Sequence, residues 1–253
     1  MKHLKLMILL FLCGALSACG SARPEQEVPV STAAAQTEAT EETVPAPTPA
    51  PAASLLYQGH ASLRITTGEG KVIYIDPYAG EGYEASADLI LVTHDHYDHN
   101  ALEKVTDRSA DCRIITSADA LHDGVYETFD LGYASVEAVQ AGNNPNHDIS
   151  VCVGYVIALS DGITVYVSGD TSATDQMASL KERNIDYAFF CCDGIYNMSP
   201  EEASQCASLV QAKHSIPYHT MDASKGLFDA SNAEAFTADS RLIVQPGEII
   251  ELD

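Results

Sequence analysis

Four metal-binding side chains lie within six residues of one short segment. The segment 93–100 reads Thr-His-Asp-His-Tyr-Asp-His-Asn and follows the apolar run Leu-Ile-Leu-Val at 89–92. The side chains at the spacing His-x-His-x-Asp-His are His94, His96, Asp98 and His99. Imidazole and carboxylate ligands together suit zinc, manganese or iron. Because one tetrahedral ion does not easily accept all four ligands, a tight loop after a strand can direct them to two ions. The sequence therefore predicts a metal-binding loop.

The elements that must position this loop are strands and helices in alternation. The predicted strands are rich in Val, Ile and Tyr, and they span 71–75, 89–93, 151–159, 164–168 and 187–192. Helical stretches fall between them, and no Gly-rich dinucleotide fingerprint is present. This pattern predicts an α/β domain.

One helix has a clear beginning. Ser199 is the expected N-cap, Pro200 occupies the first helical position, and Glu202 is expected to complete a capping box. Lys213 is expected near the helix end, where the helix dipole favours a cation. The apolar residues at helical spacing are Ala203, Cys206, Ala207 and Val210.

The first 19 residues have the pattern of an export signal. Lys2 and Lys5 precede the apolar run at 6–12, and Leu-Ser-Ala-Cys at 16–19 resembles a bacterial lipobox. The apolar run is much shorter than the ~20 residues that a membrane-spanning helix requires. We expect cleavage before Cys19 and lipidation of its sulfur, which predicts an extracytoplasmic, membrane-anchored lipoprotein of the bacterial cell envelope. Ordinary signal cleavage at the same place is the alternative.

Residues 20–53 form a predicted linker. The segment is rich in Pro, Ala, Thr and Glu and has no aromatic residue, so it buries too little apolar surface to offset the entropy of ordering. The alternating prolines at its end favour an extended spacer. Residues 54–253 then remain, enough for one domain with a sizeable core.

The charge and the cysteines exclude some classes of function. From residue 54 onwards the chain holds 31 of its 36 Asp and Glu residues but only 10 of its 13 Lys and Arg residues. Such a negative field opposes nucleic acid, which we do not expect as a partner. The five cysteines of this region are odd in number and lack a Cys-x-x-Cys motif, so neither a disulfide framework nor a thiolate zinc site is indicated.

Three further residues complete a recognisable pattern. His147, Asp170 and His219 follow the His-x-His-x-Asp-His segment in the order histidine, aspartate, histidine. Residues 54–253 thereby resemble the metallo-β-lactamase superfamily. Smaller matches, at 59–62, 75–77, 153–157 and 194–203, look like its small single-domain branch, which includes the ascorbate-6-phosphate lactonase-like proteins.

The resemblance implies a fold and a division of the ligands. The fold is a four-layer αββα sandwich of two mixed β-sheets, with the metals at one edge. Two divalent ions are expected, zinc first and manganese or iron as alternatives. The implied ligands are His94, His96 and His147 for one ion, Asp98, His99 and His219 for the second, and Asp170 between them. A hydroxide bridging the ions would be the nucleophile, and Asp98 is expected to orient it.

Four other residues are candidates for supporting roles. His60 could face the pocket or could be a satisfied core histidine. Tyr196 could supply a hydroxyl to substrate or plug the core, and Lys225 could contact an anionic substrate or lie solvated in its loop. Asp76 is expected to brace the metal loop, with a simple Asx turn as the alternative.

Three functions are compatible with these residues. The leading prediction is a dinuclear metal-dependent hydrolase that acts on an ester, lactone, amide or phosphodiester bond of a small molecule. The first alternative is a non-catalytic lipoprotein that binds metal or ligand on the same fold. The second is a redox protein like the diiron flavoproteins of the superfamily, which carry an acidic residue at the position of His96 and a flavin domain absent here. β-Lactam cleavage is disfavoured, because no cysteine occupies a ligand motif.

Overall fold

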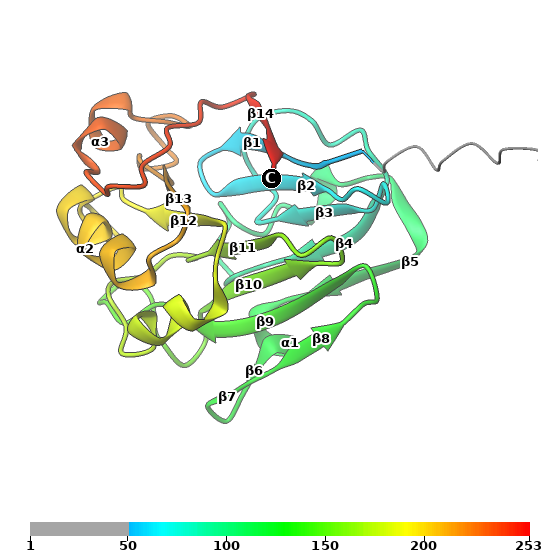
Figure 1. Cartoon of the computed structure of the whole chain (residues 1–253), viewed down its shortest axis with the longest axis horizontal. Helices are drawn as coiled ribbons and strands as arrows, with labels where there is room; N and C mark the ends of the chain where they lie inside the picture. Colours follow the sequence, from blue (N-terminus) through cyan, green and yellow to red (C-terminus); the bar gives the residue numbers. More distant parts are fainter. Residues whose placement is uncertain (1–50) are drawn as a thin grey trace, which may run out of the picture. The chain divides into compact units, whose positions relative to one another are not determined.

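Two six-stranded sheets stack face to face in the computed structural model, which describes residues 51–253 (Figure 1). The first sheet contains, in spatial order, β14 (Ile249–Leu252), β1 (Ala53–Gly59), β2 (Ser62–Thr66), β3 (Val72–Ile75), β4 (Ala87–Leu91) and β5 (Arg108–Ile115). The second contains β13 (His214–Tyr218), β12 (Tyr187–Cys191), β11 (Thr164–Val167), β10 (Val153–Leu159), β9 (Ala134–Gln140) and β8 (Thr128–Asp130). A small hairpin is formed by β6 (Leu121–His122) and β7 (Val125–Tyr126).

Each sheet is mixed in the same way. Strands β3, β4 and β5 run parallel, as do β11, β12 and β13, and the other neighbours in both sheets are antiparallel. The carboxyl ends of parallel strands meet at one edge of a sheet, where loops can converge on a ligand. The two parallel sets therefore offer loop positions at two sheet edges, and the loops after β3, β4, β11, β12 and β13 carry most of the site described below.

The main core lies between the sheets. Every residue of β12 is buried, as is every residue of β3 and β11, and large side chains fill the interior, among them Tyr57, Tyr155, Tyr166, Phe189 and Phe190. Strands buried on both faces read as nearly continuous apolar runs, which explains why these strands could be predicted. All five predicted strands are confirmed, with ends within two residues.

The outer layers contain little helix. The helices are α1 (Ser117–Ala120), α2 (Pro200–Val210), α3 (Ala230–Ala235) and the 3₁₀ segments η1 (Leu102–Lys104) and η2 (Met177–Arg183). Helices α2 and α3 lie beside β12 and β13 (Figure 1). On the first sheet, a second apolar cluster around Tyr74 and Ile90 is covered by Leu102 of η1 and Tyr83 of a loop. The predicted sandwich is confirmed, but loops supply much of its outer covering.

Helix α2 begins as predicted, with two corrections. Ser199 is the N-cap and accepts a hydrogen bond from the backbone N–H of Glu202. The Glu202 carboxylate does not complete a capping box, because it accepts instead from the backbone N–H of Ala173 in a neighbouring loop. Lys213 lies beyond the helix, which ends at Val210, and its Nζ pairs with Asp186 Oδ1 at 2.6 Å.

The five cysteines within the described residues form no disulfide, and four of them are buried. Cys191 and Cys192 pack in the main core, as predicted. The predicted signal segment 1–19 with Cys19 and most of the linker 20–53 lie outside the described residues. Within 51–253 no helix has the length and apolar character that crossing a bilayer demands.

Candidate metal centre

The candidate metal centre is formed where loops from both sheets meet. Asp76 follows β3, the His94–His99 loop follows β4, Asp170 follows β11 and His219 follows β13. The two loop systems are tied together by a backbone hydrogen bond of 3.0 Å from Val153 N to Thr93 O. The strands thus place residues far apart in the sequence at one position.

Asp170 lies at the centre of the site. Its Oδ2 is 3.3 Å from Nε2 of both His147 and His219, and its Oδ1 is 3.4 Å from Nε2 of His99. The preceding Gly169 has φ +61°, and a Cβ there would lie 2.7 Å from Val153 O. Glycine is therefore required for the turn that brings Asp170 into place.

The predicted ligands fall into groups whose ligand atoms lie within 4.8 Å of one another. The groups are His94, His96 and His147; His60, Asp98, His99 and His219; and His94, His99 and Asp170. All seven predicted ligands are thus brought together. The first two groups contain the two ligand sets implied by the resemblance, whereas the third joins His94 of one set to His99 of the other through Asp170. His60 joins the second group, where the sequence had left its role open.

Asp76 braces the metal loop from below. Its Oδ1 accepts from the backbone N–H of Thr93 at 2.7 Å, and its Oδ2 accepts from Thr93 Oγ1 at 2.7 Å and from His99 Nδ1 at 2.9 Å. Thr93 Oγ1 in turn lies 3.1 Å from His94 Nδ1. Because Thr93 donates its hydroxyl proton to Asp76, its oxygen accepts from His94. One carboxylate therefore orients two histidines, as carboxylates behind metal ligands do.

Two further histidines, His147 and His219, have a polar oxygen beside their Nδ1 atoms. His147 Nδ1 lies 3.3 Å from Asn144 Oδ1, and His219 Nδ1 lies 3.4 Å from Asp193 Oδ2. These contacts leave the Nε2 atoms directed to the centre of the site, with their lone pairs available to an ion.

The donor atoms fit bound metal. The buried polar atoms at the site that lack a hydrogen-bond partner include His94 Nε2, His99 Nε2, both ring nitrogens of His219, His60 Nδ1 and Asp170 Oδ1. Unpartnered buried polar groups are costly. Divalent ions would satisfy imidazole nitrogen and carboxylate oxygen together, so the residues present suit the ions implied by the resemblance.

The site is electrostatically coupled. Burial lowers the pKa of His94 to about 2, with nearby His99 adding to the effect. Burial also disfavours the charged form of His99, but Asp170 and Asp76 outweigh it and hold the pKa of His99 well above its usual value. Burial raises the pKa of Asp170, yet His219 and His99 together hold it well below the usual range. The Asp170 carboxylate is therefore favoured in its negatively charged form at the centre of the site.

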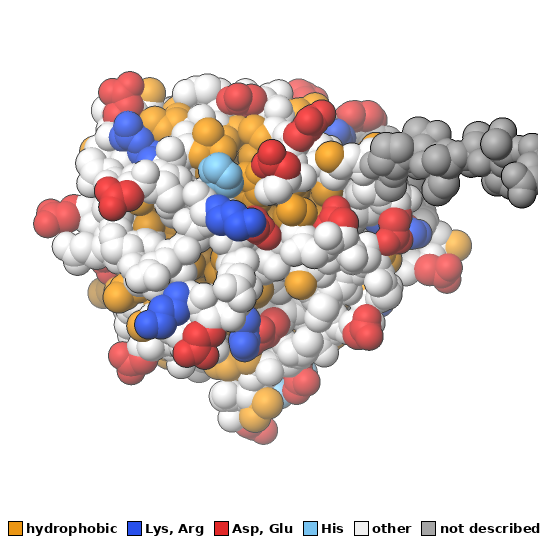
Figure 2. Space-filling model, viewed as in Figure 1, with side chains coloured by type: hydrophobic (Ala, Val, Ile, Leu, Met, Phe, Trp, Pro, Cys, Tyr) orange, Lys and Arg blue, Asp and Glu red, His pale blue; other side chains and the backbone are white. Residues whose placement is uncertain are grey.

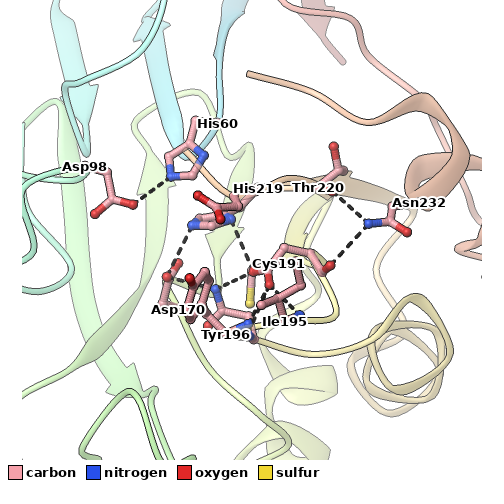
Figure 3. A network of polar contacts seen from close by, with 12 residues as sticks. His60, Asp98, Asp170, Cys191, Ile195, Tyr196, His219, Thr220 and Asn232 are labelled. Carbon is pink, nitrogen blue, oxygen red and sulfur yellow. Dashed lines mark hydrogen bonds and ion pairs between the residues drawn. The ribbon is translucent and has the colours of Figure 1, made fainter. Parts of the chain in front are cut away.

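His60 contacts Asp98 at the second group. Its Nε2 lies 3.1 Å from Asp98 Oδ2, and its ring lies 3.7 Å from the ring of His219, centroid to centroid (Figure 3). His60 is completely buried, whereas the Asp98 side chain is 16 % exposed. Burial, reinforced by His219, lowers the pKa of His60 to about 4. A neutral His60 can donate to Asp98 and hold it towards the centre.

Three residues of the site have a strained backbone. His60, Asp76 and His219 adopt positive φ angles of 52°, 45° and 44°. Non-glycine residues seldom adopt this conformation, and each instance costs of order 1–3 kcal/mol. His60 and His219 are also joined by a 2.8 Å hydrogen bond from His219 N to His60 O. The strain lies where the predicted ligands converge.

Sequence reasoning missed two residues that support the site. Asn197 donates from Nδ2 to Asp170 Oδ2 and to Asp193 Oδ2, each at 2.8 Å. Asp193 Oδ1 accepts from the backbone N–H groups of Ile195 and Tyr196 at 2.7 Å, a network seen in Figure 3. The one available signal was the position of Asp193, directly after an apolar strand-like run.

Two cavities flank the centre and share His96, Asn146 and His147. The first, the Val151 cavity, has a volume of about 560 Å³ and is also lined by Leu121, Cys152 and Val151. The second, the tyrosine cavity, has a volume of about 400 Å³ and is also lined by Tyr97, Asp98, Asp170, Tyr196, His219 and Asp222. Tyr196 therefore faces a cavity, as one of its two predicted readings required.

Lys225 lies elsewhere. It lines neither cavity, its side chain is 60 % exposed, and its Nζ is 3.8 Å from Asp222 Oδ2. The structure thus pairs Lys225 with a carboxylate at the edge of the tyrosine cavity, and the sequence reading of a solvated loop lysine describes its position.

Comparison with known proteins decides the family. The "Beta-lactamase superfamily domain" family matches residues 54–219. The chain belongs to this superfamily. It is 31% identical over 225 residues to a UPF0173 metal-dependent hydrolase of Thermococcus kodakarensis, covering 78% of this chain and 98% of the relative. The predicted enzyme class, a metal-dependent hydrolase, is confirmed.

Solved structures agree with the fold. A candidate metal-dependent hydrolase from Parabacteroides distasonis superposes with a TM-score of 0.61 at 26% identity, over 74% of this chain and 90% of that chain. Igni18, a metallo hydrolase from Ignicoccus hospitalis, gives a TM-score of 0.59 at 20% identity, over 80% and 99% of the two chains. At that identity the second likeness shows the fold alone.

Proposed function

We propose that this metal-dependent hydrolase is a dinuclear enzyme that acts outside the cytoplasm on an ester, lactone, amide or phosphodiester bond of a small molecule. One observation carries the dinuclear assignment. Asp170 Oδ2 lies 3.3 Å from His147 of the first ligand group and 3.3 Å from His219 of the second. A single carboxylate can therefore serve both groups.

The chain's residues would divide the work. His94, His96 and His147 would hold one ion, and Asp98, His99 and His219 the other. Ions bound there would supply Lewis acidity, which brings the pKa of water near neutrality and polarises a carbonyl or phosphoryl oxygen. Asp98, which contacts His60 and is 16 % exposed, would orient the attacking water and accept its proton. Zinc suits the His-rich set best, and manganese or iron also accept it.

The cavities support a small substrate. Volumes of about 400 and 560 Å³ lie within the usual range for small-molecule sites. The cavities meet at His96, Asn146 and His147, so a substrate with two arms could place its central bond beside the ligands. The likeness to the ascorbate-6-phosphate lactonase-like branch stays a prediction that makes lactones the first substrates to try.

Metal content and turnover together test the proposal. The full-length protein, purified without chelator, is expected to hold about two equivalents of zinc, manganese or iron by elemental analysis. A panel of lactones, esters, amides and phosphodiesters should then give turnover that His147→Ala abolishes. Two tightly bound ions without turnover on any class would favour the non-catalytic binding lipoprotein instead. No uptake of any of these ions would contradict the enzyme and leave a ligand-binding protein on the same fold.

The proposed location rests on the sequence at 16–19, which resembles a lipobox. The Cys19→Ala variant should leave the membrane fraction, whereas its metal content and turnover stay unchanged, because the site begins beyond residue 54. Fractionation and metabolic labelling with a radioactive fatty acid measure this. Labelling of the variant, or its retention on washed membranes, would contradict anchoring through Cys19.

A further inference from the structure

Two tyrosines present accessible rings to the tyrosine cavity. Tyr97 lies between two predicted ligands and is 70 % exposed, and Tyr196 is 44 % exposed. Tyr97 packs edge to face with Tyr78 at 5.8 Å between ring centroids. The backbone of Tyr196 is held by Asp193 Oδ1 and by Asn146, whose Nδ2 donates to Tyr196 O at 3.2 Å. Such exposed aromatic rings beside a catalytic centre are available to a substrate.

A carboxylate completes the wall of this cavity. The Asp222 side chain is only 16 % exposed, and its Oδ1 accepts from Ser224 N at 2.9 Å and from Ser224 Oγ at 2.8 Å. Its Oδ2 has a distant partner, the Lys225 ammonium at 3.8 Å. Asp222 therefore has a fixed position and an oxygen available for a second cation.

Basic side chains are absent from both cavities. None of the described residues that line the Val151 cavity or the tyrosine cavity is Lys or Arg. A substrate with a phosphate or carboxylate arm would have to place that arm beside Asp222 in the tyrosine cavity or beside Asp95 and Asp148 in the Val151 cavity. The chain as a whole is acidic, with a formal net charge of −23 at pH 7, and on the face in Figure 2 Asp and Glu side chains outnumber Lys and Arg side chains. This field repels anions.

The carboxylates within the centre can balance two bound ions. Two divalent ions bring four positive charges, and four carboxylates belong to the centre or contact its histidines: Asp76, Asp98, Asp170 and Asp193. Asp222 is additional to these four. The tyrosine cavity therefore has one carboxylate beyond those that balance the ions, and the Lys225 ammonium 3.8 Å from it is 60 % exposed, where solvent weakens its compensating charge.

We propose that the substrate carries a cationic nitrogen, which binds in the tyrosine cavity against Tyr97, Tyr196 and Asp222 while the scissile bond lies at the metal centre. Aromatic faces attract cations, and quaternary ammonium groups are recognised in this way. The inference names a substrate class and rests on the proposed hydrolase function for the identity of the site, but binding of the cation does not require turnover.

Three small probes of equal size separate charge from shape. Choline is cationic, 3,3-dimethyl-1-butanol is its neutral isostere, and 2-hydroxyethanesulfonate is an anion. Ligand-observed NMR titrations of the zinc-loaded full-length protein should show choline binding at least about tenfold more tightly than the neutral alcohol, with no binding of the anion. Added salt should weaken the binding of choline and leave the binding of the neutral alcohol unchanged.

Matched variants identify the residues responsible. Asp222→Asn keeps the Oδ1 acceptor for Ser224 and removes the charge, so choline affinity should fall roughly tenfold with the alcohol unaffected. Asp161→Asn is the control, because Asp161 Oδ1 likewise accepts from a backbone N–H two residues on, at Ile163, and lines neither cavity. Tyr196→Leu should also weaken choline binding, whereas Tyr196→Phe keeps the ring and should not.

Several outcomes would overturn the inference. Equal affinity for choline and its neutral isostere, tighter binding of the anion, or an equal effect of Asp161→Asn and Asp222→Asn would each do so. The proposed function fails separately. Selective choline binding without hydrolysis of any ester, lactone, amide or phosphodiester would contradict the proposed function and leave a cation-binding protein. Hydrolysis of neutral esters without a preference for cations would contradict only the inferred cationic substrate class.

Discussion

Asn197 donates to Asp170 Oδ2 at 2.8 Å, and the same nitrogen donates to Asp193 Oδ2 at 2.8 Å. Asp193 also lies against His219 and holds the backbone of the Tyr196 loop. The amide thus joins the central carboxylate of the metal centre to the wall of the tyrosine cavity. Movement of the cavity wall and orientation of Asp170 are therefore linked through one side chain.

Replacing Asn197 should weaken the metal centre. Asn197→Leu has a similar size but removes the donor, and loss of a residue behind a metal ligand typically costs 10–100-fold in metal affinity or activity. We expect a loss of about tenfold in metal affinity, measured by competition with a chromogenic chelator. Gln205→Ala, an exposed amide on α2, is the control. Unchanged affinity in Asn197→Leu would show that the amide only shapes the loop.

Replacing Asp170 should affect both ions. Asp170→Ala removes the carboxylate that lies within 3.4 Å of His99, His147 and His219. Elemental analysis is expected to give fewer than one ion per chain after dialysis, compared with about two in the parent. Retention of two tightly held ions would refute the central role of Asp170, and retention of one would restrict that role to a single group.

Metal removal should lower thermal stability. Five imidazole nitrogens of His60, His94, His99 and His219, and one carboxylate oxygen of Asp170, have no hydrogen-bond partner without an ion. A ligand at a thousand times its Kd stabilises by about 4 kcal/mol, which for a domain of this size raises Tm by roughly 10 °C. Calorimetry with and without EDTA measures the difference. The His94→Ala variant should show a much smaller difference in Tm with and without EDTA. An equal difference in that variant would mean that the stabilising ion binds elsewhere.

Metal binding should release protons near neutral pH. Despite burial, Asp170 and Asp76 hold the pKa of His99 well above its ordinary value, which favours the imidazolium form of His99 in the metal-free protein. A ligating imidazole must be neutral, and apparent metal affinity therefore rises as the pH increases towards that raised pKa. Titration calorimetry in buffers of different ionisation enthalpy counts the protons. Asp76→Asn should release fewer, and an affinity independent of pH from 6 to 8 would contradict the assignment.

The predicted ligands were readable because loop chemistry is local. His94, His96, Asp98 and His99 are nearly contiguous, and the strand before them is an apolar run buried on both faces. The order of the later ligands then specified the family. The sequence signal was strong wherever a residue and the element that positions it are neighbours in the chain.

The supporting network was not readable because its partners are distant in sequence. Asn197 and Asp170 are 27 residues apart, and Asn197 looks like an ordinary loop residue until β11 and β12 pair. Glu202 and Lys213 failed for a related reason. Each was expected to interact with an end of its own helix. In the structure Glu202 instead accepts from Ala173 N, and Lys213 pairs with Asp186. Local helix rules do not include such competition.

The left-handed backbone at His60, Asp76 and His219 has an evolutionary consequence. Glycine or asparagine would relieve the strain at these positions, so where metal ions are scarce a gene copy freed from selection for hydrolysis could become more heat-resistant by losing them. Decay of activity and gain of thermostability would then proceed together in its descendants. Where metal is present the balance reverses, because the bound ion stabilises the fold by more than the relief of one strained residue gains, and heat selection would then retain His219.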